Sequence, residues 1–177
     1  MKRVLNRILF LQLPRLENTN SGEDENIPLA GFYLADSLKR SDEGGNYEFR
    51  FLEPGEESLD DENLLEVISE WEPDAVCSTL YLWNVERSLN ILRRLKIRYP
   101  DIKIICGGPE TAADHPFLFK EPIADAVVIG EGECLLPEIL SCFKKGERPD
   151  YRQVAWKTDK GYVFGRYDAP VIGLNES

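Results

Sequence analysis

Short apolar runs alternate with longer amphipathic stretches along the chain, and the short runs are typical of strands. Continuous apolar strands are expected at residues 8–13, 74–78, 102–106 and 126–129, because strands buried on both faces of a parallel sheet need no polar alternation. The segment 47–51 instead alternates aromatic residues with Glu48 and Arg50. That alternation predicts a half-exposed strand at a sheet edge.

Helical spacing fills the gaps between these strands. Pro28 fits the first turn of a helix on which Leu29, Phe32 and Tyr33 share a face. The last strong helix is expected to begin near Leu135 and to end at Gly146.

Two further helices carry candidate caps. Ser58 with Asp61 resembles a capping box ahead of an apolar stripe that ends at Trp71. Asn84 precedes another apolar stripe, and its side chain is expected to cap that helix.

Strand–helix alternation repeated five times predicts an α/β fold with a doubly wound, five-stranded parallel sheet. The exposed second strand favours the Rossmann-like, flavodoxin-like order 2-1-3-4-5, which puts that strand at an edge. Residues 153–157 and 162–165 flank a turn-forming segment, which predicts a C-terminal β-hairpin. We expect an α/β domain over residues 1–149, followed by a hairpin and linker over residues 150–177.

Composition and charge exclude several classes of protein. The net charge of −11 argues against nucleic acid, whose phosphates attract a basic face. We expect no membrane partner, since no apolar run approaches the ~20 residues of a membrane helix. The apolar run at residues 8–11 is too short for a signal peptide, which favours the cytoplasm. No Cys-x-x-Cys pair occurs, and Cys77 and Cys106 lie in apolar runs, so they are expected to be buried.

In a sheet of this order a ligand binds beyond the carboxyl ends of the strands, near the switch point between the first and third strands. Gly107-Gly108-Pro109-Glu110 follows the fourth strand, and its glycines allow a close approach of the backbone to a ligand, although a tight turn also explains them. Gly130-Glu131-Gly132-Glu133 opens the last helix. Its carboxylates would repel phosphate, and they suit either the helix dipole or a ligand's hydroxyls and amides.

The segment after the third strand combines hydroxyls with aromatic rings. Ser78, Thr79 and Leu80 lead into Tyr81 and Trp83, and the two rings are suited to a large planar ligand or to packing between domains. His115 is the single histidine of the chain, with no partner for a catalytic pair visible in the sequence.

Together these segments resemble the cobalamin-binding domain that precedes the catalytic barrel in B12-dependent radical S-adenosylmethionine (SAM) enzymes. The resemblance covers residues 8–170 and rests on Pro73 to Ser78, Gly107 to Glu110 and Val128 to Glu133. The wider cobalamin-binding fold has Ser-x-Leu followed by Gly-Gly, and here Ser78-Thr79-Leu80 precedes Gly107-Gly108. By this resemblance, Ser78 and Leu80 border the pocket of the dimethylbenzimidazole tail, and the glycines let the tail pass the sheet. A Gly108→Val variant is then expected to block the tail.

One motif of that fold is missing. Its Asp-x-His-x-x-Gly segment, whose histidine ligates cobalt, is replaced here by Pro14 to Asn20. The resemblance then implies base-off cobalamin without a histidine ligand, as in many B12-dependent radical SAM proteins.

The Cys-x-x-x-Cys-x-x-Cys motif that holds the [4Fe-4S] cluster is also missing. Cluster and SAM are therefore expected in a radical SAM barrel of the same polypeptide, outside this chain. That enzyme would be a methyltransferase or an oxidative cyclase, and the chain alone would not be catalytic.

Other functions remain open at this point. A degenerate scaffold would bind no cofactor and would only pack against the barrel. A phosphorylation receiver has acidic residues where this chain has Gln12 and Ser78. A flavodoxin-like domain has a phosphate loop where this chain has Thr19 to Gly22 amid acidic residues.

Overall fold

The structure is a computed structural model that describes residues 5–15, 26–41, 46–111, 118–120, 122–148 and 150–167. Its strands form one seven-stranded sheet of order β2-β1-β3-β4-β5-β6-β7. Their bounds are β1 Arg7–Leu11, β2 Glu48–Phe51, β3 Ala75–Thr79, β4 Lys103–Gly107, β5 Ala126–Val128, β6 Val154–Thr158 and β7 Gly161–Phe164. The first five strands are parallel and follow the expected order 2-1-3-4-5.

The expected C-terminal hairpin is present, and it continues the sheet. Strand β6 pairs antiparallel with β5, and β7 pairs antiparallel with β6. Ala155 and Trp156 of β6 are buried in the two cores on either side of the sheet.

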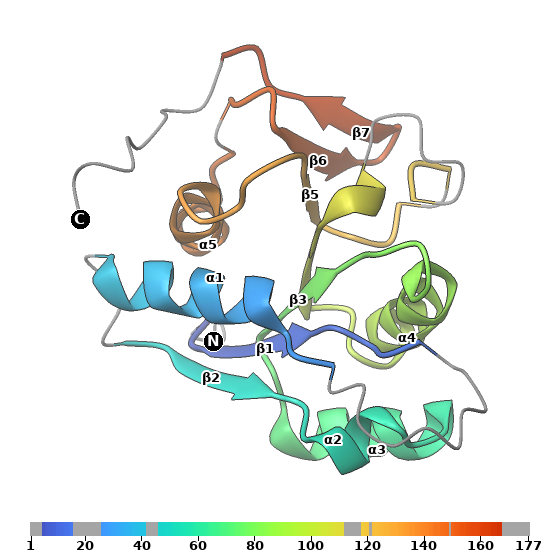
Figure 1. Ribbon diagram of the computed structural model, residues 1–177. Coiled ribbons are helices and arrows are strands. Elements are labelled where there is room, and N and C mark those ends of the chain that lie inside the picture. The colour runs from blue at the N-terminus through green and yellow to red at the C-terminus, as the bar shows by residue number, and fades with distance from the viewer. Residues whose placement is uncertain are drawn as a thin grey trace.

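Helices cover both faces of the sheet (Figure 1). Helices α1 (Leu29–Arg40) and α5 (Leu135–Lys145) pack on one face, and α3 (Asp61–Trp71) and α4 (Val85–Arg98) on the other. A one-turn helix α2 (Pro54–Glu57) and a 3-10 turn (Pro109–Thr111) complete the described elements. Each face has its own buried apolar cluster, and Cys77 and Cys106 are buried on opposite sides, as expected.

Helix α1 buries a different face from the one that the apolar residues suggest. Leu29, Phe32 and Tyr33 are exposed, whereas Gly31, Ala35 and Leu38 are buried. A Cβ atom at Gly31 would lie 3.0 Å from the Phe51 ring and 3.1 Å from Phe10 Cβ. The small residue therefore lets α1 rest close on these rings, and the centres of the Phe32 and Phe51 rings lie 4.5 Å apart.

Two expected caps are wrong. Asp60, not Ser58, caps α3, and its carboxylate accepts hydrogen bonds from Glu62 N and Asn63 N at 3.0 and 3.1 Å. Ser58 instead ends the unexpected helix α2. Asn84 does occupy the N-cap position of α4, but its side chain makes no cap hydrogen bond.

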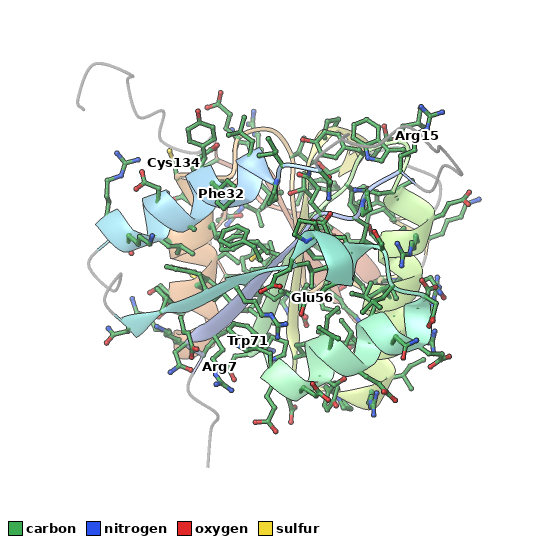
Figure 2. All side chains as sticks on the ribbon, turned by 60° about the horizontal axis from the view of Figure 1, so that its bottom comes forward. Arg7, Arg15, Phe32, Glu56, Trp71 and Cys134 are labelled. Atoms are coloured by element: carbon green, nitrogen blue, oxygen red, sulfur yellow. The ribbon has the colours of Figure 1, made fainter. Side chains whose placement is uncertain are left out.

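The amino ends of the strands are held by local polar contacts. Asp74 accepts hydrogen bonds from Asn6 N and Arg7 N. The Arg7 guanidinium lies 5.5 Å from the centre of the Trp71 ring (Figure 2). These contacts close that end of the sheet, and the cavity described next lies at the other end.

Candidate functional site

A cavity of about 520 Å³ opens at the carboxyl ends of β3, β4 and β5. Most of the residues singled out from the sequence line it: Ser78, Thr79, Tyr81, Gly107, Gly108, Pro109, Gly130, Glu131, Gly132 and Glu133. Three loops that are far apart in the sequence therefore meet around one space. The lining residues come from β3, β4, β5, α1, α5 and their loops rather than from β1, so the cavity lies to one side of the expected switch point.

Three of the singled-out residues lie outside the lining. Leu80 is fully buried in the core beneath α3 and α4. Trp83 is 51% exposed and stacks on Tyr81, with ring centres 4.5 Å apart and planes 6° from parallel. Glu110 donates its backbone N–H to Leu80 O. Trp83 therefore lies at the rim of the cavity, whereas Leu80 supports the loop from within the core.

Sequence reasoning missed the wall that the helices supply. Ala30 and Leu34 of α1 and Leu136 of α5 face the strand ends across the cavity. A Cβ atom at Gly132 would lie 3.1 Å from Leu34 Cδ2, so Gly132 allows α1 to approach the loop. The Ser37 hydroxyl of α1 also donates to Glu133 O. The apolar face predicted for α1 from Leu29, Phe32 and Tyr33 gave no signal for this contact, because Ala30, Leu34 and Ser37 lie on another face of the helix.

The two adjacent glycines after β4 have different roles. Gly108 has φ +104°, and a Cβ atom there would lie 2.6 Å from Leu80 O and 2.9 Å from Leu80 N. The turn itself therefore requires Gly108, because L side chains rarely adopt this conformation. A Cβ atom at Gly107 would meet no described atom within 4 Å. Gly107 lines the cavity, so its missing side chain leaves space there.

Hydroxyl groups contribute unequally to the cavity. Thr111 is buried, and its Oγ1 lies 2.8 Å from both Gly108 O and Val128 O, so it ties the loop after β4 to the end of β5. Ser78 Oγ is buried with no hydrogen-bond partner among the described residues. Side chains alternate along β3, which places this hydroxyl on the same face as Val76, toward α4 and away from the cavity floor.

Two thiols beside the cavity are held in the neutral form. Cys77 and Cys106 both line it and are buried. Burial raises the pKa of Cys106 to about 12 and raises that of Cys77 further, so both remain neutral thiols. Among the described residues there is no group of three or more His, Cys, Asp or Glu that could hold a metal ion. His115 lies outside the described residues.

The family model of the B12 binding domain matches residues 20–140 of this sequence. This chain belongs to the B12-binding domain family. Over 85 residues, it is 35% identical to the cobalamin-dependent radical SAM methyltransferase TokK of Streptomyces tokunonensis, covering 47% of this chain and 12% of that protein. Over 178 residues, it is 31% identical to the anaerobic magnesium-protoporphyrin IX monomethyl ester cyclase of Rubrivivax gelatinosus, covering 94% of this chain and 30% of that protein.

Solved structures support the fold. The cobalamin-dependent SAM radical enzyme OxsB, with aqua-cobalamin and SAM bound, superposes with a TM-score of 0.66 at 14% identity, over 97% of this chain and 23% of OxsB. This chain thus spans less than a third of the relatives and structures named here. No helix among the described residues is long and apolar enough to span a membrane.

The residues of this B12-binding domain fit a cobalamin tail. The cavity is walled by aliphatic side chains from both helices and by backbone from the strand ends, which suits a flat apolar base. The absence of a side chain at Gly107 leaves room beside the end of β4. The stacked rings of Tyr81 and Trp83 lie at the rim, where a macrocycle would meet them.

Proposed function

We propose that this chain binds base-off cobalamin, with the nucleotide tail inserted in the cavity between the strand ends and helix α1. The space beside Gly107 carries the proposal, because a residue with an ordinary side chain would fill it. Membership of the B12-binding domain family supports the choice of ligand. A scaffold that had lost cofactor binding would have no need to keep this space open.

Each loop has a separate task in this proposal. Thr79 and the Gly107-Gly108-Pro109 turn border the tail, while Tyr81 and Trp83 face the macrocycle at the rim. Glu131 and Glu133 accept hydrogen bonds from amide or hydroxyl groups of the cofactor, since their carboxylates disfavour its phosphate. Ser78, Leu80 and Glu110 support these loops from beneath.

A tail base held in this cavity would be kept away from cobalt, and residues 14–26 contain no histidine that could replace it. When bound, the corrin cobalt would supply methyl-transfer or redox chemistry to the whole enzyme. We propose that the [4Fe-4S] cluster, SAM and the radical SAM barrel belong to the rest of the polypeptide, with a domain boundary near residues 149–150. The full-length relatives include a methyltransferase and a cyclase, and we propose one of these two reaction types.

The proposal is tested by filling the space beside Gly107. The Gly107→Val variant adds side-chain volume inside the cavity at a backbone position with no positive φ. Gly55→Val is the matched control, since a Cβ atom there also meets no described atom within 4 Å and lies on the surface in α2. Hydroxocobalamin is added to each protein, excess is removed by desalting, and bound cobalamin is measured by its absorbance.

We expect the parent chain and Gly55→Val to retain cobalamin and Gly107→Val to lose it, with unchanged far-UV circular dichroism in all three proteins. If Gly107→Val retains as much cobalamin as the parent chain, the tail does not use this cavity. If the parent chain retains none, the scaffold function is favoured instead.

A further inference from the structure

Asn84 is fully buried, yet its side chain joins the segment after β1 to the segment at the end of β3, at the carboxyl end of the sheet. Nδ2 donates to Leu13 O at 3.0 Å and to Thr79 O at 3.2 Å. Oδ1 accepts a hydrogen bond from Tyr81 N at 2.9 Å. Both amide hydrogens and the amide oxygen are therefore used, and the side chain is 1% exposed. A helix cap would use only the side-chain oxygen. Here the NH2 group is bonded as well, so the side chain holds backbone segments together and does not cap α4.

The same residue closes the loop that carries the exposed rings. Asn84 N donates to Tyr81 O at 3.0 Å, so main chain and side chain of Asn84 both bond to Tyr81. The short loop between them is thus fastened at its base to the ends of β1 and β3. It projects Leu82 and Trp83, which are 78% and 51% exposed.

The two rings of this loop form one stacked pair, with Tyr81 half-buried and Trp83 exposed. Tyr81 lines the cavity, and Trp83 lies parallel to it at 4.5 Å. Contiguous exposed apolar surface is typical of a binding site, and Leu82 and Trp83 expose such surface next to the cavity. When the conformation of these side chains is fixed before binding, the loss of conformational entropy on binding is smaller.

We propose that Asn84 is a positioning residue that presents the Tyr81–Trp83 ring pair to the macrocycle of cobalamin. The inference rests on the proposed function, because the ring pair needs a flat ligand at the cavity mouth. Asn84 itself touches no ligand, since it is buried beneath the loop. Its effect on binding passes entirely through the orientation of the two rings.

A double-mutant cycle separates positioning from general stability. The dissociation constant for hydroxocobalamin is measured for the parent chain, Trp83→Ala, Asn84→Ala and the double variant. Trp83→Ala and Asn84→Ala are each expected to weaken binding about tenfold, the scale of one well-placed aromatic contact. The double variant is expected to bind no more weakly than Trp83→Ala alone, because the ring that Asn84 orients is already absent.

Asn90→Ala is the matched control on the same helix. Asn90 Nδ2 donates to Asp61 Oδ2 at 3.0 Å, so an alanine there loses one polar contact between α3 and α4, remote from the cavity. Binding by this variant should equal that of the parent chain. Asn84→Ser, which is smaller but still polar, replaces Asn84→Ala in the cycle if the alanine variant does not fold.

The outcomes are distinct. If the parent chain binds no hydroxocobalamin, the proposed function fails. If the parent chain binds and the effects of Trp83→Ala and Asn84→Ala add in full, Asn84 acts on stability alone and the inference is overturned. An unchanged affinity for Trp83→Ala overturns it as well, because the ring pair would then not face the ligand.

Discussion

Adjacent glycines at the end of β4 should respond in opposite directions to the same substitution. Gly107→Ala places a methyl group in open space at an ordinary φ, whereas Gly108→Ala places it against the backbone of Leu80 at φ +104°. The first change reduces the freedom of the unfolded chain without a native clash. The second strains the native state, and both can be measured on the chain without any ligand.

The magnitudes follow from the local geometry. A non-glycine residue in such a sparsely populated conformation costs about 1–3 kcal/mol. The 2.6 Å approach to Leu80 O must also be relieved, which disturbs the 2.7 Å bond from Leu80 N to Gly107 O and costs roughly 1 kcal/mol more. We expect a total loss of about 3 kcal/mol for Gly108→Ala, a fall in Tm of about 6–12 °C for a chain of this length. Gly107→Ala should gain about 0.4–1 kcal/mol.

Urea denaturation followed by circular dichroism gives the free energy of unfolding for each variant, and calorimetry gives Tm. The free energy of unfolding should be higher than that of the parent chain for Gly107→Ala and lower for Gly108→Ala. If Gly108→Ala is as stable as Gly107→Ala, the close approach of Gly108 to Leu80 is wrong. The expected destabilisation also makes Gly108→Val a poor probe of the tail path, since loss of cobalamin would then accompany loss of the fold.

Three further predictions concern ionisation and the metal. Glu57 is 6% exposed, and burial raises its pKa. The folded state therefore favours the protonated form, and stability falls as pH rises from about 4.3 to the raised pKa. Glu57→Gln should remove this dependence and stabilise the chain at pH 7, as measured by urea denaturation against pH; an unchanged pH profile would contradict the burial effect. Cys77 and Cys106 should resist a thiol reagent in the native chain and react after denaturation, and rapid native labelling at either position would refute their burial. Electron paramagnetic resonance of bound Co(II) cobalamin should lack nitrogen superhyperfine splitting, and its presence would exclude base-off binding without a histidine ligand.

The positions of β1, β3, β4 and β5 could be predicted from this sequence because these parallel strands are apolar on both faces. The edge strand was found by the same logic, since alternation within residues 47–51 marks one half-exposed face. Helix boundaries were less predictable. Ser58 and Asp60 both suit a cap, and the choice depends on Pro54, which begins a separate turn before α3.

The loops of the candidate site could also be found, because glycine pairs directly after apolar strands are local signals. The helical wall on the opposite side of the cavity could not be predicted from the sequence. Helix α1 contributes Ala30 and Leu34 to this wall. The packing of α1 follows from Gly31, which rests on Phe10 of β1 and Phe51 of β2. The apolar residues of α1 suggested the wrong face, since a helix that packs closely on aromatic rings buries its small residues.

Asn84 shows why residue type and position together can still give the wrong role. An asparagine before an apolar helical stripe is typical of a cap, and the position was correct. Its side chain bonds instead to carbonyls at the ends of β1 and β3, one of which lies 71 residues away. Those carbonyls are buried beneath the loop, and leaving one without a donor would be more unfavourable than leaving a helix N–H in contact with water. Burial of these carbonyls therefore decides which groups the Asn84 side chain bonds to. That burial exists only once β1 and β3 lie side by side.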